Sequence, residues 1–219
     1  SIDATNNGAS AAGGNINFGS LTGAFDLAVN AGTGGAIAVN TTTNITDLTL
    51  TRATGTTFTG NVTVNDLITT ANSGTVTLNG AVNTFAAAVD FLNTGLVTLG
   101  NGGDSSTFAN GVTFSANAAS NLGGAIVTSG DVANFGTGGV TLGSDSTVDT
   151  TSATPAGANI IFGAGIAGAN NLGLTAGTGG AVTVATTTNI TDLTLTSAVS
   201  NTFAGSVTVN DLITTANSE

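Results

Sequence analysis

Residues 31–73 read AGTGGAIAVNTTTNITDLTLTRATGTTFTGNVTVNDLITTANS, and residues 176–218 read AGTGGAVTVATTTNITDLTLTSAVSNTFAGSVTVNDLITTANS. The same 43-residue stretch therefore occurs twice, 145 residues apart, with 34 positions identical. Internal repetition at a fixed interval is typical of solenoids, propellers and other arrays, in which each unit buries its apolar side against the next. This repeat is the starting point for interpreting the rest of the chain.

The repeated unit extends toward the N-terminus, because residues 1–19 have a later counterpart in residues 147–163 with small differences in length. Two related units, residues 1–74 and residues 147–219, therefore flank a different unit, residues 75–146. We expect residues 1–219 to form a single continuous domain, and we expect the array to extend beyond both of its ends.

The composition favours strands over helices. The chain has 33 Gly, one Pro and ten Phe among its 219 residues, and it has no Cys, Met, Trp, Tyr or His. Short segments of three to five residues, in which apolar residues alternate with Thr, recur about every ten residues and end at Gly, Asn or Asp. Many short strands joined by tight turns are the expected outcome.

A recurring Val-Thr-Leu motif indicates the coil length. It occurs at residues 76–78, 97–99 and 140–142, at separations of 21 and 43 residues. These separations predict an all-β fold, a right-handed parallel β-helix (β-solenoid) with coils of about 21 residues. About ten coils at about 4.8 Å each give a rod of roughly 50 Å. Because seven such coils span about 147 residues, we expect the 145-residue offset to be a whole number of coils.

The pattern also predicts where particular side chains lie. Small aliphatic residues should point inward and Thr and Asn outward, and the differences between the two copies around Arg52–Asn61 should lie in an outward loop. The Gly pairs at residues 34–35 and 179–180 should turn the backbone with positive φ. The wider corners should be filled by Phe18, Phe58 and Phe114.

The alternative fold is a run of immunoglobulin-like β-sandwiches, one for each unit of about 72 residues. Residues 1–74 and 75–146 do not resemble each other, and a seven-stranded sandwich generally needs about 100 residues. The sequence therefore favours the solenoid.

The charge excludes several classes of partner. Eleven Asp and one Glu stand against a single basic residue, Arg52, which gives a net charge of -11. A nucleic-acid-binding protein needs clustered Lys and Arg, and attraction to anionic lipid needs the same residues. No stretch has the length of apolar sequence that a membrane-spanning helix requires. We therefore expect neither a nucleic-acid partner nor membrane insertion.

Chemistry at a site would have to rely on Asp, because the chain lacks His, Cys, Lys and Tyr, which usually serve as bases and nucleophiles. We predict no catalytic residue, no cofactor-binding residue and no enzymatic activity, and a polysaccharide lyase is disfavoured for the same reason. Calcium is the one cofactor that the oxygen-rich composition admits. The simpler interpretation of Asp47, Asp66, Asp192 and Asp211 is turn capping. The candidate metal ligands are Asp104, Asp47, Asp66, Asp192 and Asp211.

Pairs of Thr separated by one residue occur at residues 49 and 51, 75 and 77, and 194 and 196. A flat Thr ladder of the ice-binding type would need one such pair in every coil, and the sequence does not have that regularity. Thr on an outward strand face is ordinary, because a β-branched side chain suits a half-exposed pleated surface.

Residues 171–184 (NLGLTAGTGGAVTV) and 74–82 (GTVTLNGAV) resemble the β-strand repeats of giant bacterial surface proteins, the filamentous-haemagglutinin-like adhesins and large exoproteins. The resemblance implies an extracellular or cell-surface fibre built on a right-handed β-helix. The function we expect is a non-enzymatic structural repeat that forms a stalk or filament. The alternative is an adhesin module that binds glycans or other cells. The partners we expect are other copies of the chain in a fibre, or adjacent repeats of the same chain.

Overall fold

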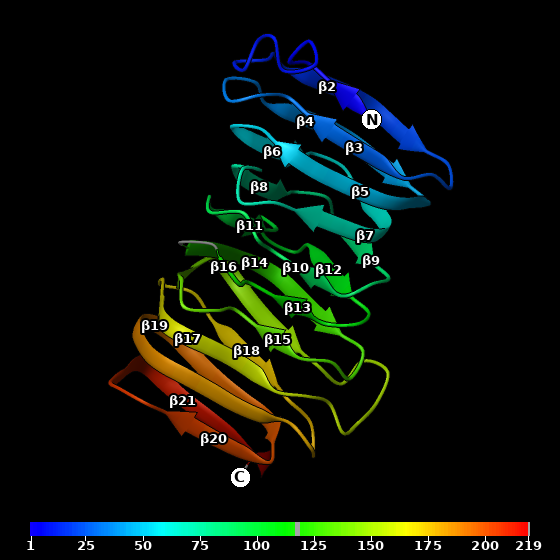
Figure 1. Cartoon of the computed structure of the whole chain (residues 1–219). Coiled ribbons are helices and arrows are strands. Elements are labelled where there is room, and N and C mark those ends of the chain that lie inside the picture. The colour runs from blue at the N-terminus through cyan, green and yellow to red at the C-terminus, as the bar shows by residue number, and fades with distance from the viewer. Residues whose placement is uncertain (117–118, 219) are drawn as a thin grey trace.

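The chain forms a parallel β-solenoid, an elongated rod with its termini at opposite ends (Figure 1). This computed structural model describes residues 1–116 and 119–218. Within those ranges there is no helix, and the 21 strands pair in parallel ladders with coils of about 21 residues. The predicted fold class is therefore confirmed, with about nine turns. None of the described residues belongs to a helix that could span a membrane.

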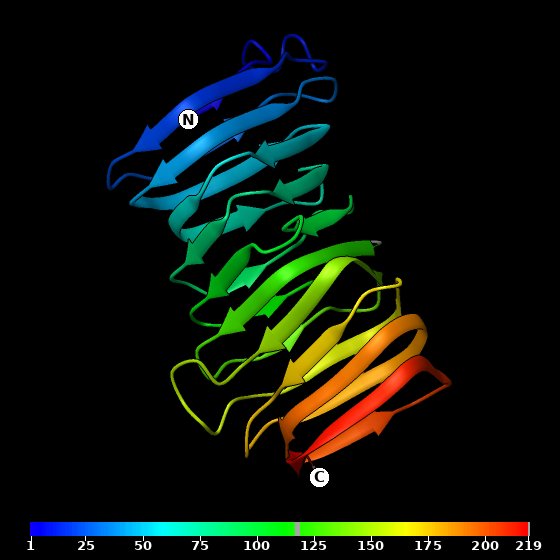
Figure 2. The ribbon, with the colours of Figure 1, turned by 180° about the vertical axis from the view of Figure 1, so that it is seen from behind.

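The strands are stacked one above another along the rod (Figure 2). Many are longer than the predicted three to five residues, because they continue around a corner of the coil. The first eleven are β1 Ile2–Asp3, β2 Ile16–Thr22, β3 Leu27–Asn30, β4 Ile37–Thr43, β5 Ile45–Arg52, β6 Gly55–Phe58, β7 Val62–Thr69, β8 Thr75–Leu78, β9 Val82–Phe85, β10 Val89–Asp90 and β11 Val97–Leu99. The others are β12 Ser105–Phe108, β13 Val112–Thr113, β14 Ala119–Thr128, β15 Ala133–Asn134, β16 Gly139–Asp149, β17 Ile160–Ala167, β18 Leu172–Thr175, β19 Ala181–Ala198, β20 Ser200–Phe203 and β21 Val207–Ser218.

Each turn of the solenoid contributes to three faces, which the chain visits in a fixed order. The first face is the ladder through Ile16, Ile37, Thr56, Val76, Val97, Ser120, Val140, Ile166, Thr187 and Val207. The second face begins with the register partners Leu21 and Thr42. It continues in the ladder through Val62, Asn83, Ser106, Ile126, Val148, Leu174, Leu195 and Thr214. The third face consists of two successive ladders. The first passes through Ile2, Val29, Leu50 and Thr69, and the second passes through Val89, Val112, Ala133, Ile160, Val182 and Asn201.

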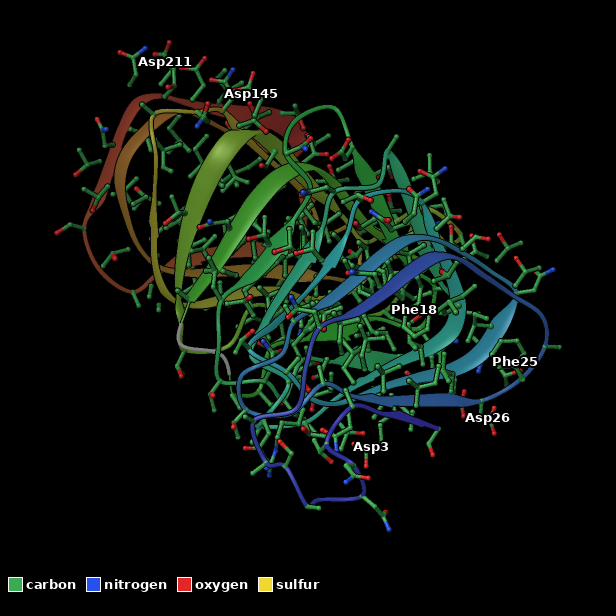
Figure 3. All side chains as sticks on the ribbon, turned by 90° about the horizontal axis from the view of Figure 1, so that it is seen from above. Asp3, Phe18, Phe25, Asp26, Asp145 and Asp211 are labelled. Atoms are coloured by element: carbon green, nitrogen blue, oxygen red, sulfur yellow. The ribbon has the colours of Figure 1, made fainter. Side chains whose placement is uncertain are left out.

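The solenoid is right-handed, as predicted. Seen from the N-terminal end, the chain runs clockwise from Phe18 through Phe25 to Asp26 while it recedes from the viewer (Figure 3). The coil length varies along the rod. The coil that leads from Leu48 to its register partner Leu67 is one of the short ones, and the coil from Ala133 to its partner Ile160 is clearly longer.

One continuous core occupies the interior, and its middle section is filled by stacked aromatic rings. Phe114 lies 4.9 Å from Phe91 and 5.2 Å from Phe135 between ring centroids, and Phe135 lies 4.5 Å from Phe162 at an interplanar angle of 3°. Stacked rings add to the stabilisation that their burial gives. The inward placement predicted for Phe58 and Phe114 is confirmed, whereas Phe18 is only partly buried.

The glycine pairs have a different role from the one predicted. Positive φ occurs at Gly32 (85°) and Gly177 (81°), whereas Gly34–Gly35 and Gly179–Gly180 have ordinary φ. At Gly35 a Cβ atom would collide with the carbonyl oxygens of Ala31 and Gly14. This glycine is therefore needed for the close approach of neighbouring coils, and the prediction of positive φ at these pairs is wrong.

The repeat offset is not a whole number of coils. Ile16 lies on the first face, but its counterpart Ile160 lies on the third face. Thr187 lies on the first face, although its counterpart Thr42 lies on the second. From Ile16 the first face is revisited at Ile37, Thr56, Val76, Val97, Ser120 and Val140, and the second face is then passed before Ile160 is reached.

The second copy therefore begins after six turns and two further faces. At about 4.8 Å per turn the two copies are separated by about 32 Å along the rod axis. They are also rotated by a third of a turn, so the prediction that the offset is a whole number of coils is wrong. The reason is that the coil lengths vary, so the offset between the copies does not add up to seven complete turns.

The nine differences between the copies all lie within residues 37–40 and 52–61 of the first copy. Three of them, Thr54, Thr59 and Asn61, lie in exposed connections between strands, but the other six belong to strands, so the prediction of an outward loop is wrong for most of them. Strands β4 and β6, which contain most of these positions, pair with each other on the first face, and Thr56 is fully buried there. Variation is thus concentrated on one face of each copy and on the corners beside it, and the stretches 41–51 and 62–73 are identical to their counterparts.

Thr56 offers a test of the core. It is fully buried between the paired Ile37 and Val76, and its hydroxyl has no hydrogen-bond partner among the described residues. We expect Thr56→Val to raise the free energy of unfolding by about 1–2 kcal/mol, because a desolvated hydroxyl is replaced by a methyl group. Chemical denaturation measures the change. The outward neighbour Thr57 is the control, because Thr57→Val should change stability by less than about 0.5 kcal/mol.

Candidate functional site

Four of the five predicted metal-ligand candidates form two pairs. Asp47 and Asp66 are register partners on successive coils, and so are their copies Asp192 and Asp211. Because of the third-of-a-turn rotation, the first pair lies where the chain enters the third face and the second pair where it enters the second face. Asp104 belongs to neither pair.

Sequence reasoning missed Asp26 and Asp145, which lie in line with these two pairs on earlier coils. Asp26 precedes Leu27, the register partner of Leu48, so it lies one coil before Asp47. Asp145 accepts hydrogen bonds from the backbone N–H (2.9 Å) and the side-chain Nδ2 (3.2 Å) of Asn171 on the next coil. Their positions depend on the length of each intervening coil, which the sequence pattern did not specify. Figure 3 shows Asp145 and Asp211 on one side of the rod and Asp26 on another.

In the first pair, the carboxylate of Asp66 is perturbed by its surroundings. Partial burial raises the pKa of Asp66, the negative charge of Asp47 raises it further, and the backbone hydrogen bond at Leu67 opposes both effects. A long hydrogen bond of 3.5 Å runs from Asn65 Nδ2 to Asp47 Oδ1 beside the pair. The pair is thus an acidic row on the surface.

This pKa shift leads to a prediction on pH dependence. The folded protein binds the Asp66 proton more tightly than the unfolded chain does. The free energy of unfolding should therefore fall as the pH rises from the ordinary Asp value of 3.8 through the raised pKa of the folded state. Asp66→Asn should flatten that fall and raise stability at neutral pH by less than about 1 kcal/mol, because solvent screens a partly exposed pair. Denaturation at a series of pH values measures this slope, and an unchanged slope in the variant contradicts the assignment.

Other Asp side chains cap turns. Asp104 accepts a hydrogen bond from the N–H of Asn101 at 2.9 Å. Asp3 accepts bonds from the N–H and the hydroxyl of Thr5, which hold its pKa below the ordinary value, and Asp149 makes the same two bonds with Thr151. Turn capping is therefore the role of these three carboxylates.

The described residues bring no three acidic side chains together at a potential metal position. A pair of carboxylates supplies fewer oxygens than the six to eight that Ca²⁺ takes. The geometry of Asp47 with Asp66, and of Asp192 with Asp211, therefore gives no support to calcium binding.

A shallow open trough of about 600 Å³ runs along the second face. Small residues leave room for it, because Ala125 and Gly173 occupy outward positions that Thr147 and Thr194 occupy on neighbouring turns. Carboxylates and hydroxyls at its edges can hydrogen-bond a polar ligand. Its lining consists of Gly103, Asp104, Gly124, Ala125, Asp145, Ser146, Thr147, Asn171, Leu172, Gly173, Thr194 and Thr196.

The three Thr pairs do not form one array. Thr77 lies on the first face, Thr194 on the second and Thr49 on the third. A single row does exist on the first face, where Thr57, Thr77 and Thr98 are successive register partners. This row was not predicted, because its members belong to coils of different lengths.

In comparisons with known proteins, no family model, no curated protein and no solved structure matches the chain. The fold and the surface therefore define it by class alone, as a parallel β-solenoid with a low content of charged residues.

Proposed function

We propose that the chain is a non-enzymatic structural repeat that forms part of an extracellular stalk or filament on a bacterial surface. The observation that carries this proposal is the uninterrupted stacking of about nine turns around one continuous core. Every turn pairs with the next, so added turns add length at constant cross-section. The third-of-a-turn rotation distributes the acidic rows over two sides of the rod.

The resemblance of residues 74–82 and 171–184 to repeats of bacterial surface proteins supports the same role. So does the composition, since polar side chains on the outside of the rod are mostly uncharged Thr, Ser and Asn. The Asp side chains that make hydrogen bonds cap turns or join coils, as Asp104 and Asp145 do. These contacts serve the architecture of the rod.

A deletion in the native protein tests the proposal. Removing residues 31–175 joins Asn30 to Ala176, which leaves the repeated sequence continuous at the junction. We expect the surface fibre to become shorter by about 32 Å, the axial separation of the two copies. Electron micrographs of the fibre measure its length. A fibre of unchanged length would contradict a role as a stalk segment.

The trough on the second face favours a second candidate, an adhesin module that binds glycans. A glycan array probed with the wild-type chain and with Thr194→Arg tests it, because Arg at this position fills the trough. Thr183→Arg on the third face is the matched control. Binding that Thr194→Arg abolishes and Thr183→Arg retains would support the adhesin, and an inert array would support the spacer.

A further inference from the structure

The first face carries no charge along the part of the chain that the structure describes. The strand segments of this face contain only uncharged residues from Asn15 to Val209. The charges of the described residues are therefore distributed over the other two faces and their corners. The charged residues on the second and third faces, and on the corners that lead into them, are Asp3, Asp26, Asp47, Arg52, Asp66, Asp90, Asp104, Asp131, Asp145, Asp149, Asp192 and Asp211.

The rotation of the repeat explains why one face stays neutral. In the first copy the acidic row of Asp47 and Asp66 leads into the third face, so the first and second faces are uncharged. In the second copy the row of Asp192 and Asp211 leads into the second face, so the third and first faces are uncharged. The first face is the one that both copies leave neutral.

The neutral face has a regular outward row. Its side chains are small, and most present a hydroxyl or an amide beside a methyl group or the flat strand backbone. The register partners in this row are Asn17, Ala38, Thr57, Thr77, Thr98, Asn121, Thr141, Ala167 and Thr188.

The area of the face is close to what a specific interface needs. About nine turns at about 4.8 Å, with about five residues per strand at about 3.3 Å, give a surface of roughly 43 by 17 Å. The resulting area of about 700 Å² is near the roughly 800 Å² that each partner buries in a standard interface.

We propose that the first face is a lateral contact between two copies of this chain, paired face to face. The inference rests on the proposed structural role and names the partner of the rod. Any contact that uses the second or third face of either rod places unpaired carboxylates in the interface, and pairing two such faces also brings like charges together, because each rod has eleven Asp and one Arg. Like charges at an interface cost several kcal/mol, so the charge distribution restricts association to the one neutral face. A pair formed in this way is two-fold symmetric and closed, because both partners use the same surface.

Sedimentation equilibrium on the purified chain tests the pairing. We expect a concentration-dependent monomer–dimer equilibrium in which added salt strengthens the dimer, because salt screens the net repulsion between acidic rods. Thr98 lies near the middle of the face, and Thr98→Glu should weaken dimerisation at least tenfold by placing two carboxylates in the contact. Thr107 is the matched control, because it is outward on the second face and Thr107→Glu should leave the equilibrium unchanged.

A mixing experiment separates a direct contact from a folding defect. Thr98→Lys and Thr98→Glu should each be monomeric alone and should form heterodimers when mixed. Wild-type chain that stays monomeric at all concentrations would overturn the pairing. An equal loss of dimer in Thr98→Glu and in the control Thr107→Glu would overturn it as well. Small-angle X-ray scattering of the dilute monomer distinguishes this outcome from failure of the structural role. If the monomer is a rod about 43 Å long, the structural role stands even though the pairing fails. If it is a globular particle, the structural role fails as well.

Discussion

Replacing Gly35 by Ala is expected to lower the free energy of unfolding by about 3 kcal/mol, because the added methyl group has no space. An ideal Cβ atom at this position overlaps the carbonyl oxygen of Ala31 in the same coil and that of Gly14 in the coil before it. Both obstacles are backbone atoms, and the second belongs to a neighbouring coil. Removing this overlap would require the two coils to move apart, which would weaken the strand pairing between them at the corner.

Gly19 provides the matched control for this substitution. It also lies in the first copy and on the strand side of a corner, but a Cβ atom there meets nothing within 4 Å. We expect Gly19→Ala to leave stability unchanged or to raise it by about 0.5 kcal/mol, through the reduced flexibility of the unfolded chain. Chemical denaturation of both variants measures the difference. Equal stability of the two variants would contradict the close-approach role assigned to Gly35.

Phe135→Ala is expected to destabilise the rod by about 3–5 kcal/mol, the range for truncation of a buried aromatic residue. Phe135 is fully buried, and its ring lies between those of Phe114 at 5.2 Å and Phe162 at 4.5 Å. Truncation would leave a cavity and would also remove both ring contacts at once. The surrounding coils cannot close the cavity easily, because each is fixed by ladders on both sides.

Ile161 is the control for this prediction. It belongs to the same third-face ladder as the partner of Asn134, but it points outward and is partly exposed. Ile161→Ala should cost less than about 1 kcal/mol. Thermal or chemical unfolding of both variants gives the comparison. A loss at Phe135 no larger than that at Ile161 would show that the stack contributes nothing beyond its neighbours.

The coil length was predictable because Val76, Val97 and Val140 keep their places in a repeated Val-Thr-Leu motif on one face. A strand of alternating inward and outward residues must keep this pattern from coil to coil to keep its core face buried. The spacing of the three motifs was enough to indicate a solenoid and its average coil. It was not enough to specify the length of each coil.

The surface could not be predicted, because a side chain's neighbours in a solenoid depend on the number of residues between them. The coil that leads from Ser146 to its register partner Leu172 is longer than the average, and its extra residues lie in the connection between the strands. Such insertions shift every later residue to another position around the rod. The Asp145 contact with Asn171 and the neutral first face both depend on these lengths, so neither follows from the motif alone.

The rotation of the repeat has a consequence for any longer array with the same period. A third copy would direct its aspartates toward the first face, and the uncharged strip would continue on another side. The strip would then wind around the rod and return to its starting side after three periods, about 96 Å along the axis. Two rods joined along such a strip would have to coil around each other, as the strands of a rope do.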